Sequence, residues 1–141
     1  MLVVQAETVH PEVSADGTFV VYGRPEGGGS IAIDVVRVAD GAVFPLARGF
    51  TGISALRARW IGATHTIAFR ARETDGSISL YAQEFRPGVD TTATRRKLIS
   101  TDSDATLETF AISPDGKRAI LAIVDEASGL MMAEGVEGIV K

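Results

Sequence analysis

Cysteine is absent from the 141-residue chain, which excludes disulfide bridges, thiolate nucleophiles and cysteine-ligated zinc. Long hydrophobic runs are also missing. The longest unbroken apolar stretches, such as Ala119–Val124, have about six residues, whereas a helix needs about 20 to span a bilayer. The opening Met1-Leu2-Val3-Val4 has neither the basic lead-in nor the long apolar segment of a signal peptide. We therefore expect a cytoplasmic protein by default, with a periplasmic location left open if the chain is a fragment.

An excess of positive charge is lacking too. The chain has 14 Lys and Arg residues against 18 Asp and Glu residues, which gives a formal net charge of -4. Nucleic-acid-binding domains usually carry a basic face, so we expect no nucleic-acid partner, and we expect no membrane insertion. The hydrophobic fraction of 45% and the charged fraction of 23% are typical of a globular protein. The length suits one domain with a substantial core.

Helical periodicity is scarce, and apolar residues mostly alternate with polar ones at period 2, which predicts β-strands. Asp40-Gly41 and Asp75-Gly76 predict hairpin turns, because glycine adopts the positive φ that such turns need. Pro45 predicts an outer, unpaired strand edge. Ala127–Glu134 is the one segment that competes as a helix, but its glycines favour a strand. The chain is predicted to be all-β, with strands at Thr18–Tyr22, Ile31–Val38, Val43–Leu46, Thr66–Phe69, Ile78–Phe85, Lys97–Ile99, Arg118–Val124 and Leu130–Val136.

An internal repeat organises these strands. Val13–Tyr22 aligns with Ile112–Leu121, and Trp60–Phe69 lies between them with a degraded turn. A period near 50 residues with about four strands per unit is typical of a propeller blade. The Ser-Pro-Asp-Gly turn at 113–116 has a physical basis, because proline presets φ, the aspartate accepts a backbone N–H bond and glycine reverses the chain. We expect the large aromatic residues to pack between blades rather than on a ligand: Trp60, Phe69 and Tyr81.

The residues of these turns resemble a known family. Val13–Gly17 and Phe110–Arg118 are similar to the β-propeller repeats of TolB-type proteins and of prolyl-oligopeptidase-like peptidases. Arg95–Ile139 also resembles the last blades of propellers appended to some bacterial Ser/Thr kinases. The resemblance implies a six-bladed ring that serves as an interaction or sensing platform. This chain would supply three four-stranded blades, at residues 8–48, 53–100 and 105–141.

A half-ring leaves two open apolar flanks, which favour aggregation. Two solutions are open: the chain is a fragment of a longer propeller, or two copies pair about a twofold axis into one closed ring. We expect the homodimer. Residues 1–6 precede the first blade and are predicted to form a closing strand that completes the last blade of the partner copy.

Catalytic and ligand-binding motifs are few. The chain has no G-x-S-x-G nucleophile elbow and no kinase signature, and His10 and His65 are its two histidines. Asp102-Ser103-Asp104 lacks the later glycine and glutamate of a calcium loop. Gly27–Ser30 lacks the Gly-Lys-Ser/Thr of a phosphate loop. Arg95-Arg96-Lys97 is an ordinary solvated cluster, or a contact for an acidic partner. We therefore expect no enzyme activity, no metal and no cofactor.

The candidate site is placed by the repeat. Inner strands line the channel of a propeller, and loops gather at its faces, so residues at the ends of the inner strands are the binding candidates. The sequence predicts a non-enzymatic scaffold that binds a protein, peptide or small ligand at its channel or loop face. The alternative is a regulatory or substrate-gating fragment of a larger bacterial kinase or peptidase. The candidate ligand-binding residues are His10, Glu12, Arg57, Arg59, Glu108 and Thr109.

Overall fold

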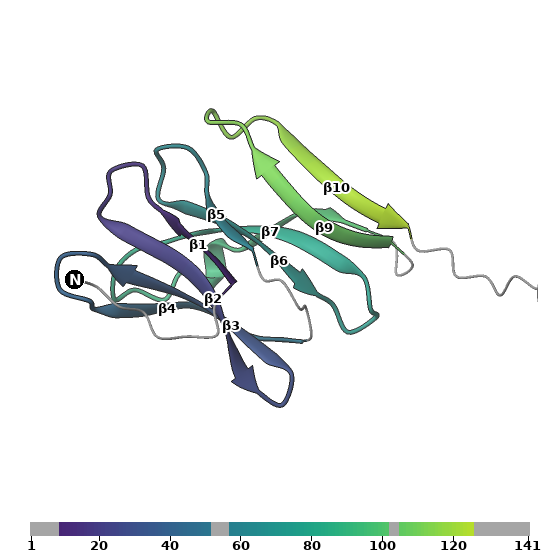
Figure 1. Cartoon of the computed structure of the whole chain (residues 1–141), viewed down its shortest axis with the longest axis horizontal. Coiled ribbons are helices and arrows are strands. Elements are labelled where there is room, and N and C mark those ends of the chain that lie inside the picture. The colour runs from purple at the N-terminus through teal and green to yellow at the C-terminus, as the bar shows by residue number, and fades with distance from the viewer. Residues whose placement is uncertain (1–8, 52–56, 102–104, 126–141) are drawn as a thin grey trace, which may run out of the picture.

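The computed structural model describes residues 9–51, 57–101 and 105–125, and within these ranges the chain is all-β and antiparallel (Figure 1). The strands fall into three consecutive units. The first unit contains β1 (Val9–Val13), β2 (Phe19–Gly27), β3 (Ser30–Arg37) and β4 (Val43–Thr51). The second contains β5 (Ala58–Trp60), β6 (Thr66–Arg72), β7 (Ile78–Glu84) and β8 (Arg96–Ser100), with the single-turn 3-10 helix η1 (Thr92–Thr94) before β8. The third contains β9 (Ala105–Ile112) and β10 (Ala119–Asp125).

Each of the first two units is a four-stranded meander, in which every strand pairs with the next one along the chain. β4 and β6 join the two meanders through a single residue pair, Thr51 with Arg72. β9 and β10 form a separate hairpin. The predicted strands within the described residues are confirmed, but three are longer than predicted: β2 continues to Gly27, β4 to Thr51 and β6 to Arg72. Leu130–Val136, Ala127–Glu134 and the predicted closing strand 1–6 lie outside the described residues.

The repeat is visible in the first hairpin of each unit. Its closing backbone bond runs from Ser14 to Phe19 in the first unit, and the equivalent bonds in the other two units have almost the same length, 2.8 to 2.9 Å. Asp16 accepts bonds from the Ser14 hydroxyl at 2.6 Å and from the Thr18 N–H at 3.0 Å. The Ser14 bond and then the Thr18 bonds stabilise the carboxylate and lower the pKa of Asp16 to about 2. Asp115 accepts the same pair of bonds in the third unit. The predicted role of the turn aspartate is therefore confirmed.

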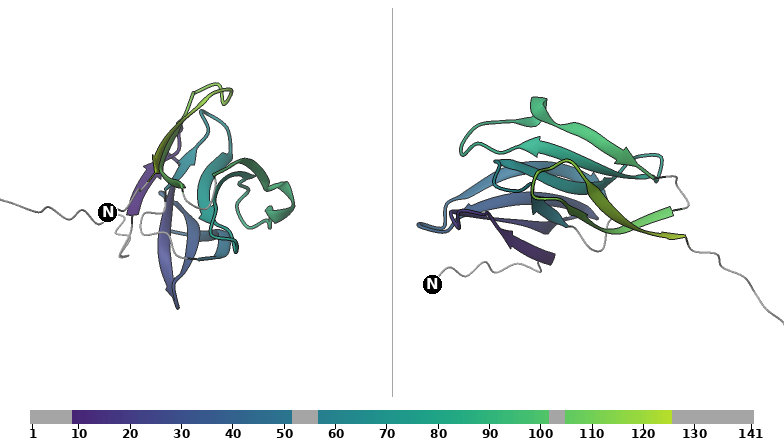
Figure 2. Two further views of the ribbon diagram at one scale, coloured as in Figure 1. Left: turned by 90° about the vertical axis from the view of Figure 1, so that its right-hand side faces the viewer. Right: turned by 90° about the horizontal axis from the view of Figure 1, so that it is seen from above.

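The three turns lie next to one another in space (Figure 1). Residues 14–16 of the first turn and 63–65 of the second line one shallow cavity. The second and third turns are closer still. A Cβ atom added to Gly62 would lie 2.0 Å from the carbonyl oxygen of Pro114. The units thus follow one another as neighbours, and in both views of Figure 2 the β9–β10 hairpin lies beside the second unit.

The hydrophobic core lies between the units. Trp60 donates its indole N–H to the carbonyl of Glu12 in the first unit and packs edge-on against Phe85. Phe69 stacks on Tyr81 and contacts Phe50 of β4, with ring centroids 5.8 and 5.6 Å apart. The expectation that Trp60, Phe69 and Tyr81 pack between units is confirmed. A second cluster joins the second and third units and includes Ile61, Ala68, Ile78, Leu80, Ala82, Leu107 and Phe110.

Candidate functional site

Four of the six candidate residues line one cavity. His10 and Glu12 of the first unit lie opposite Arg57 and Arg59 of the second, around a space of about 340 Å³. Glu12 lies on β1 and Arg59 on β5, whereas Arg57 directly precedes β5. His10 has φ 61, a conformation uncommon outside glycine, at an irregularity in the β1–β2 pairing.

Glu12 is also a structural link between the units. Its carboxylate accepts a hydrogen bond from Arg59 Nη1 at 3.0 Å and one from the backbone N–H of Trp60 at 3.1 Å. Both charged side chains are about one-third exposed, so the ion pair contributes on the order of 1 kcal/mol or less. The sequence pattern grouped Glu12 and Arg59 among the candidate residues but did not show that they bind each other.

The arginines of this cavity have unused hydrogen-bonding capacity. The Nε atoms of Arg57 and Arg59 are buried and have no acceptor in the part of the chain that the structure describes. A buried donor without a partner costs about 1 to 3 kcal/mol. Because both atoms are closed to solvent, a ligand oxygen would reach them only after the arginine side chains shift.

Glu108 and Thr109 do not line this cavity; they lie on β9 in the third unit. Arg70 of β6 connects that strand to the second unit, because its guanidinium donates to the carbonyl oxygens of Leu107 and Glu108. Burial lowers the pKa of Arg70, the positive charge of Arg57 lowers it further, and the Glu108 carboxylate raises it. Arg57, Arg70 and Glu108 are thus electrostatically coupled across the second and third units.

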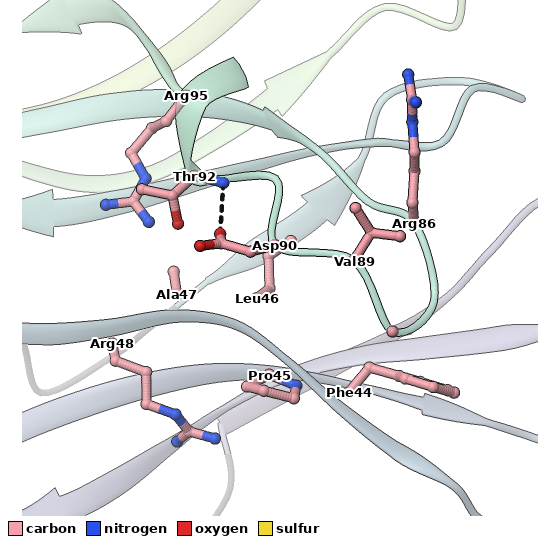
Figure 3. Close-up of a pocket in the computed structure, with 11 residues that line it drawn as sticks. Phe44, Pro45, Leu46, Ala47, Arg48, Arg86, Val89, Asp90, Thr92 and Arg95 are labelled. Atoms are coloured by element: carbon pink, nitrogen blue, oxygen red, sulfur yellow. Dashed lines mark hydrogen bonds between the residues drawn. The ribbon is translucent and has the colours of Figure 1, made fainter.

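A larger cavity, of about 590 Å³, was not predicted from the sequence. It lies between β4 and the connection 86–95 of the second unit (Figure 3). Arg95, part of the predicted basic cluster, and Pro45, predicted at a strand edge, both line it. Arg95 lies about 50 residues from Pro45 along the chain. The full lining is Phe44, Pro45, Leu46, Ala47, Arg48, Arg86, Gly88, Val89, Asp90, Thr92 and Arg95.

Ser14, Asp16 and His65 line the shallow cavity between the first two turns, and these are the residue types of a catalytic triad. The Ser14 hydroxyl donates to Asp16 and accepts the N–H of Phe19. A nucleophilic serine must instead donate to its histidine base. This geometry is that of a capped turn.

The described residues contain neither a metal-binding cluster nor a membrane-spanning helix. Within ranges 9–51, 57–101 and 105–125, no group of three or more His, Asp or Glu side chains is placed to hold a metal ion. The same ranges contain no helix with the length and apolar character needed to cross a membrane.

Comparison with known proteins adds no assignment. No protein-family model matches the chain, and no curated protein matches it. The resemblance to TolB-type repeats therefore stays a prediction, carried by the turn residues and by the repeated hairpins.

Proposed function

We propose that the protein is a non-enzymatic β-propeller scaffold of the TolB type, with three blades per chain, that binds a peptide segment at the ends of its inner strands. One observation carries the proposal. His10, Glu12, Arg57 and Arg59 come from equivalent strands of two units and converge on one cavity, where two arginine Nε atoms lack acceptors. A peptide offers carbonyl and carboxylate oxygens to the guanidinium groups of Arg57 and Arg59, and Glu12 favours its N–H and cationic groups.

The second part of the proposal is ring closure by a second copy. Among the described residues β10 pairs with β9 alone, and Ile120 and Ile123 of β10 are 77% and 52% exposed. Apolar side chains on an unpaired edge strand favour association. A twofold axis would bring two such flanks into equivalent junctions, and each arginine of the site would occur twice around one channel.

Light scattering after size exclusion tests the closure. The dimer predicts a mass of twice 14.9 kDa that persists on dilution. A monodisperse monomer would overturn the closed ring but not peptide binding to a single chain, so the two parts of the proposal fail separately.

Selection from a library of random displayed peptides tests the binding site. Peptides retained by the wild-type protein are measured again with Arg57→Ala and Glu12→Gln, and with Arg96→Ala as the control, because Arg96 is an exposed residue of β8 outside both cavities. Loss of a charge-assisted hydrogen bond is expected to weaken binding by about ten- to a hundredfold in Arg57→Ala. Equal affinity for wild-type and both site variants, or a wild-type protein that retains no peptide, would refute the site.

A further inference from the structure

The cavity of about 590 Å³ between β4 and the connection 86–95 shares no lining residue with the proposed peptide site. Its volume falls in the range of small-molecule sites, about 300 to 1,000 Å³. Its walls come from different units, β4 of the first and the β7–β8 connection of the second (Figure 3). The cavity therefore exists only when these two units are packed together.

One wall is apolar and held in place by aromatic packing. Phe44 packs edge-on against Phe19 and Phe85, with centroids 6.4 and 6.0 Å away. Leu46 and Ala47 are buried, while Val89 on the opposite side is 56% exposed. Such a wall is preformed, so a ligand would lose little free energy in organising it.

The rest of the lining is basic, but its three arginines differ in what they bind. Arg48 forms ion pairs with Glu26 and Asp34, and Arg86 forms one with Glu84. For Arg95, no carboxylate in the described ranges lies within ion-pair distance. Arg95 is therefore the arginine of this lining without a direct ion pair, although the charge of Asp90 acts on it from a greater distance.

Arg95 is nevertheless held firmly. Its Nε donates to Gln83 Oε1 at 2.8 Å, and its guanidinium lies over the rings of Phe50 and Phe69, 5.1 and 5.7 Å from their centroids. Gln83 is itself buried and donates to the Leu46 carbonyl at 3.1 Å. Figure 3 shows the guanidinium group directed toward Ala47. The orientation is therefore set by the protein before any ligand binds.

Asp90 is the acidic residue of the lining, and it is already engaged. Its carboxylate accepts the Thr92 N–H at 2.9 Å, and the bonds from Thr92 lower the pKa of Asp90. Arg48 and Arg86 are already matched by carboxylates outside the lining, so Arg95 is the lining cation that a ligand can still pair with. An anionic ligand supplies that ion pair, and a neutral or cationic one does not.

We propose that this cavity binds a small amphipathic monocarboxylate. Its hydrocarbon part lies against Phe44, Leu46 and Val89, and its carboxylate accepts hydrogen bonds from the guanidinium of Arg95. Guanidinium matches a carboxylate in shape and charge, and the adjacent apolar wall selects acids with a hydrocarbon tail. The proposal is independent of the peptide site.

Octanoate is a suitable probe, titrated into the full chain by calorimetry and by NMR of the methyl groups. For a ligand of this size we expect a Kd of roughly 1 mM, with the resonances of Ala47 and Val89 shifting. Octanol and octylamine, which have the same tail, are expected to bind at least about ten times more weakly. Added salt should weaken octanoate binding, because the contact is ionic.

Arg95→Met is expected to weaken octanoate binding by about tenfold or more, while the neighbouring Arg96→Met remains as wild type. Arg95→Lys keeps the charge without the planar donor pair, so it should fold and lose only part of the affinity even if Arg95→Met does not fold. Arg57→Ala should leave octanoate binding unchanged, which separates this site from the peptide site.

Three results would overturn the proposal. Octanol binding as tightly as octanoate would show an apolar pocket without anion recognition. Octanoate binding with full affinity to both Arg95→Met and Arg95→Lys would place the acid elsewhere. An acetylated tetrapeptide that binds through its terminal carboxylate at least ten times more tightly than octanoate would identify a chain terminus as the occupant instead.

Discussion

Replacement of Gly62 by alanine is the most informative perturbation of the fold. Gly62 has φ +56 and lies in the turn of the second unit, against the turn of the third. An added Cβ would meet the Pro114 carbonyl oxygen at 2.0 Å, far inside the ordinary contact distance. Because the obstacle is backbone rather than a flexible side chain, the two turns must move apart by roughly 1 Å or more to restore a normal contact.

The cost has two parts that the structure separates. The left-handed conformation costs alanine about 1 to 2 kcal/mol. The displaced turn weakens the contact between the second and third units, where Leu107 and Phe110 are buried. Complete loss of that contact would expose two large apolar side chains, at about 1.5 to 3 kcal/mol each. We therefore expect Gly62→Ala to destabilise the protein by about 2 kcal/mol or more beyond the backbone cost.

Gly17→Ala is the matched control, because Gly17 has φ +72 in the first turn and an added Cβ would meet nothing within 4 Å. Urea unfolding, followed by the fluorescence of the single tryptophan Trp60, gives the free energy of unfolding of both variants. Hydrogen exchange then locates the damage. Amides of β9 and β10 should lose protection in Gly62→Ala, while those of β2 and β3 keep it.

Equal destabilisation by the two substitutions would refute this reasoning, since it would leave only the backbone cost. Unchanged protection of β9 and β10 in Gly62→Ala would refute it independently, because the third unit would then not depend on the close approach of the two turns.

Three further predictions concern buried charge and acid stability. Arg70→Met should cost about 2 to 4 kcal/mol in urea unfolding, because the carbonyl oxygens of Leu107 and Glu108 lose a charged donor; a loss below 1 kcal/mol would contradict this anchoring role. Asp34→Asn should cost about 2 kcal/mol in the same assay, because its side chain is only 2% exposed and its carboxylate binds two partly exposed arginines, Arg24 and Arg48. Asp40→Asn is the control and should cost less, because the Arg37–Asp40 pair is exposed. In the folded protein the pKa of Asp16 is lowered from 3.8 to about 2. Asp16 should therefore stabilise the protein above about pH 4 and lose that contribution as the pH falls through 2. In Ser14→Ala the pKa of Asp16, followed by carboxyl NMR, should rise toward 3.8, and an unchanged titration would contradict the turn mechanism.

Much of the fold was predictable because alternation and turn chemistry are local. β3 and β7 were predicted within about one residue at each end, because buried β-branched residues end at Asp-Gly turns or polar connections. β4 is longer than predicted. Arg48 and Gly49 interrupt the apolar pattern there, and the strand continues because Phe50 packs on Phe69 of the next unit. That contact joins residues far apart in sequence.

The second turn shows why the repeat survived in structure after its residues changed. Thr64 replaces the glycine of the other turns, yet its N–H still donates to the carbonyl of Ile61, as Gly17 does to Ser14. The Thr64 hydroxyl donates to the same carbonyl and accepts the N–H of Thr66. The strands that flank the turn carried the alignment, and the hydrogen bonds confirm it.

The sequence grouped the residues of the candidate site but did not predict how their side chains contact one another. Repeat register alone placed Glu12 and Arg59 at the same end of neighbouring strands, and the structure brings them into one cavity. Their mutual ion pair depends on side-chain conformations that no local pattern encodes. The sequence showed Arg95 only as one of three consecutive basic residues. Its cavity could not be predicted, because it forms where β4 and the connection 86–95 pack against each other.

The approach of Gly62 to Pro114 also bears on how such chains diverge. Of the three units, the second has a neighbour on each side among the described residues, and it is also the one whose turn has lost the Asp-Gly pair. At a flanked position the adjacent main chain restricts which side chain fits, whereas a turn facing solvent keeps the residues that favour its own geometry. In this chain the unit whose turn contacts both of the other turns is thus the one whose motif is hardest to recognise. Counting Asp-Gly turns at the equivalent positions finds the first and third units and misses the second.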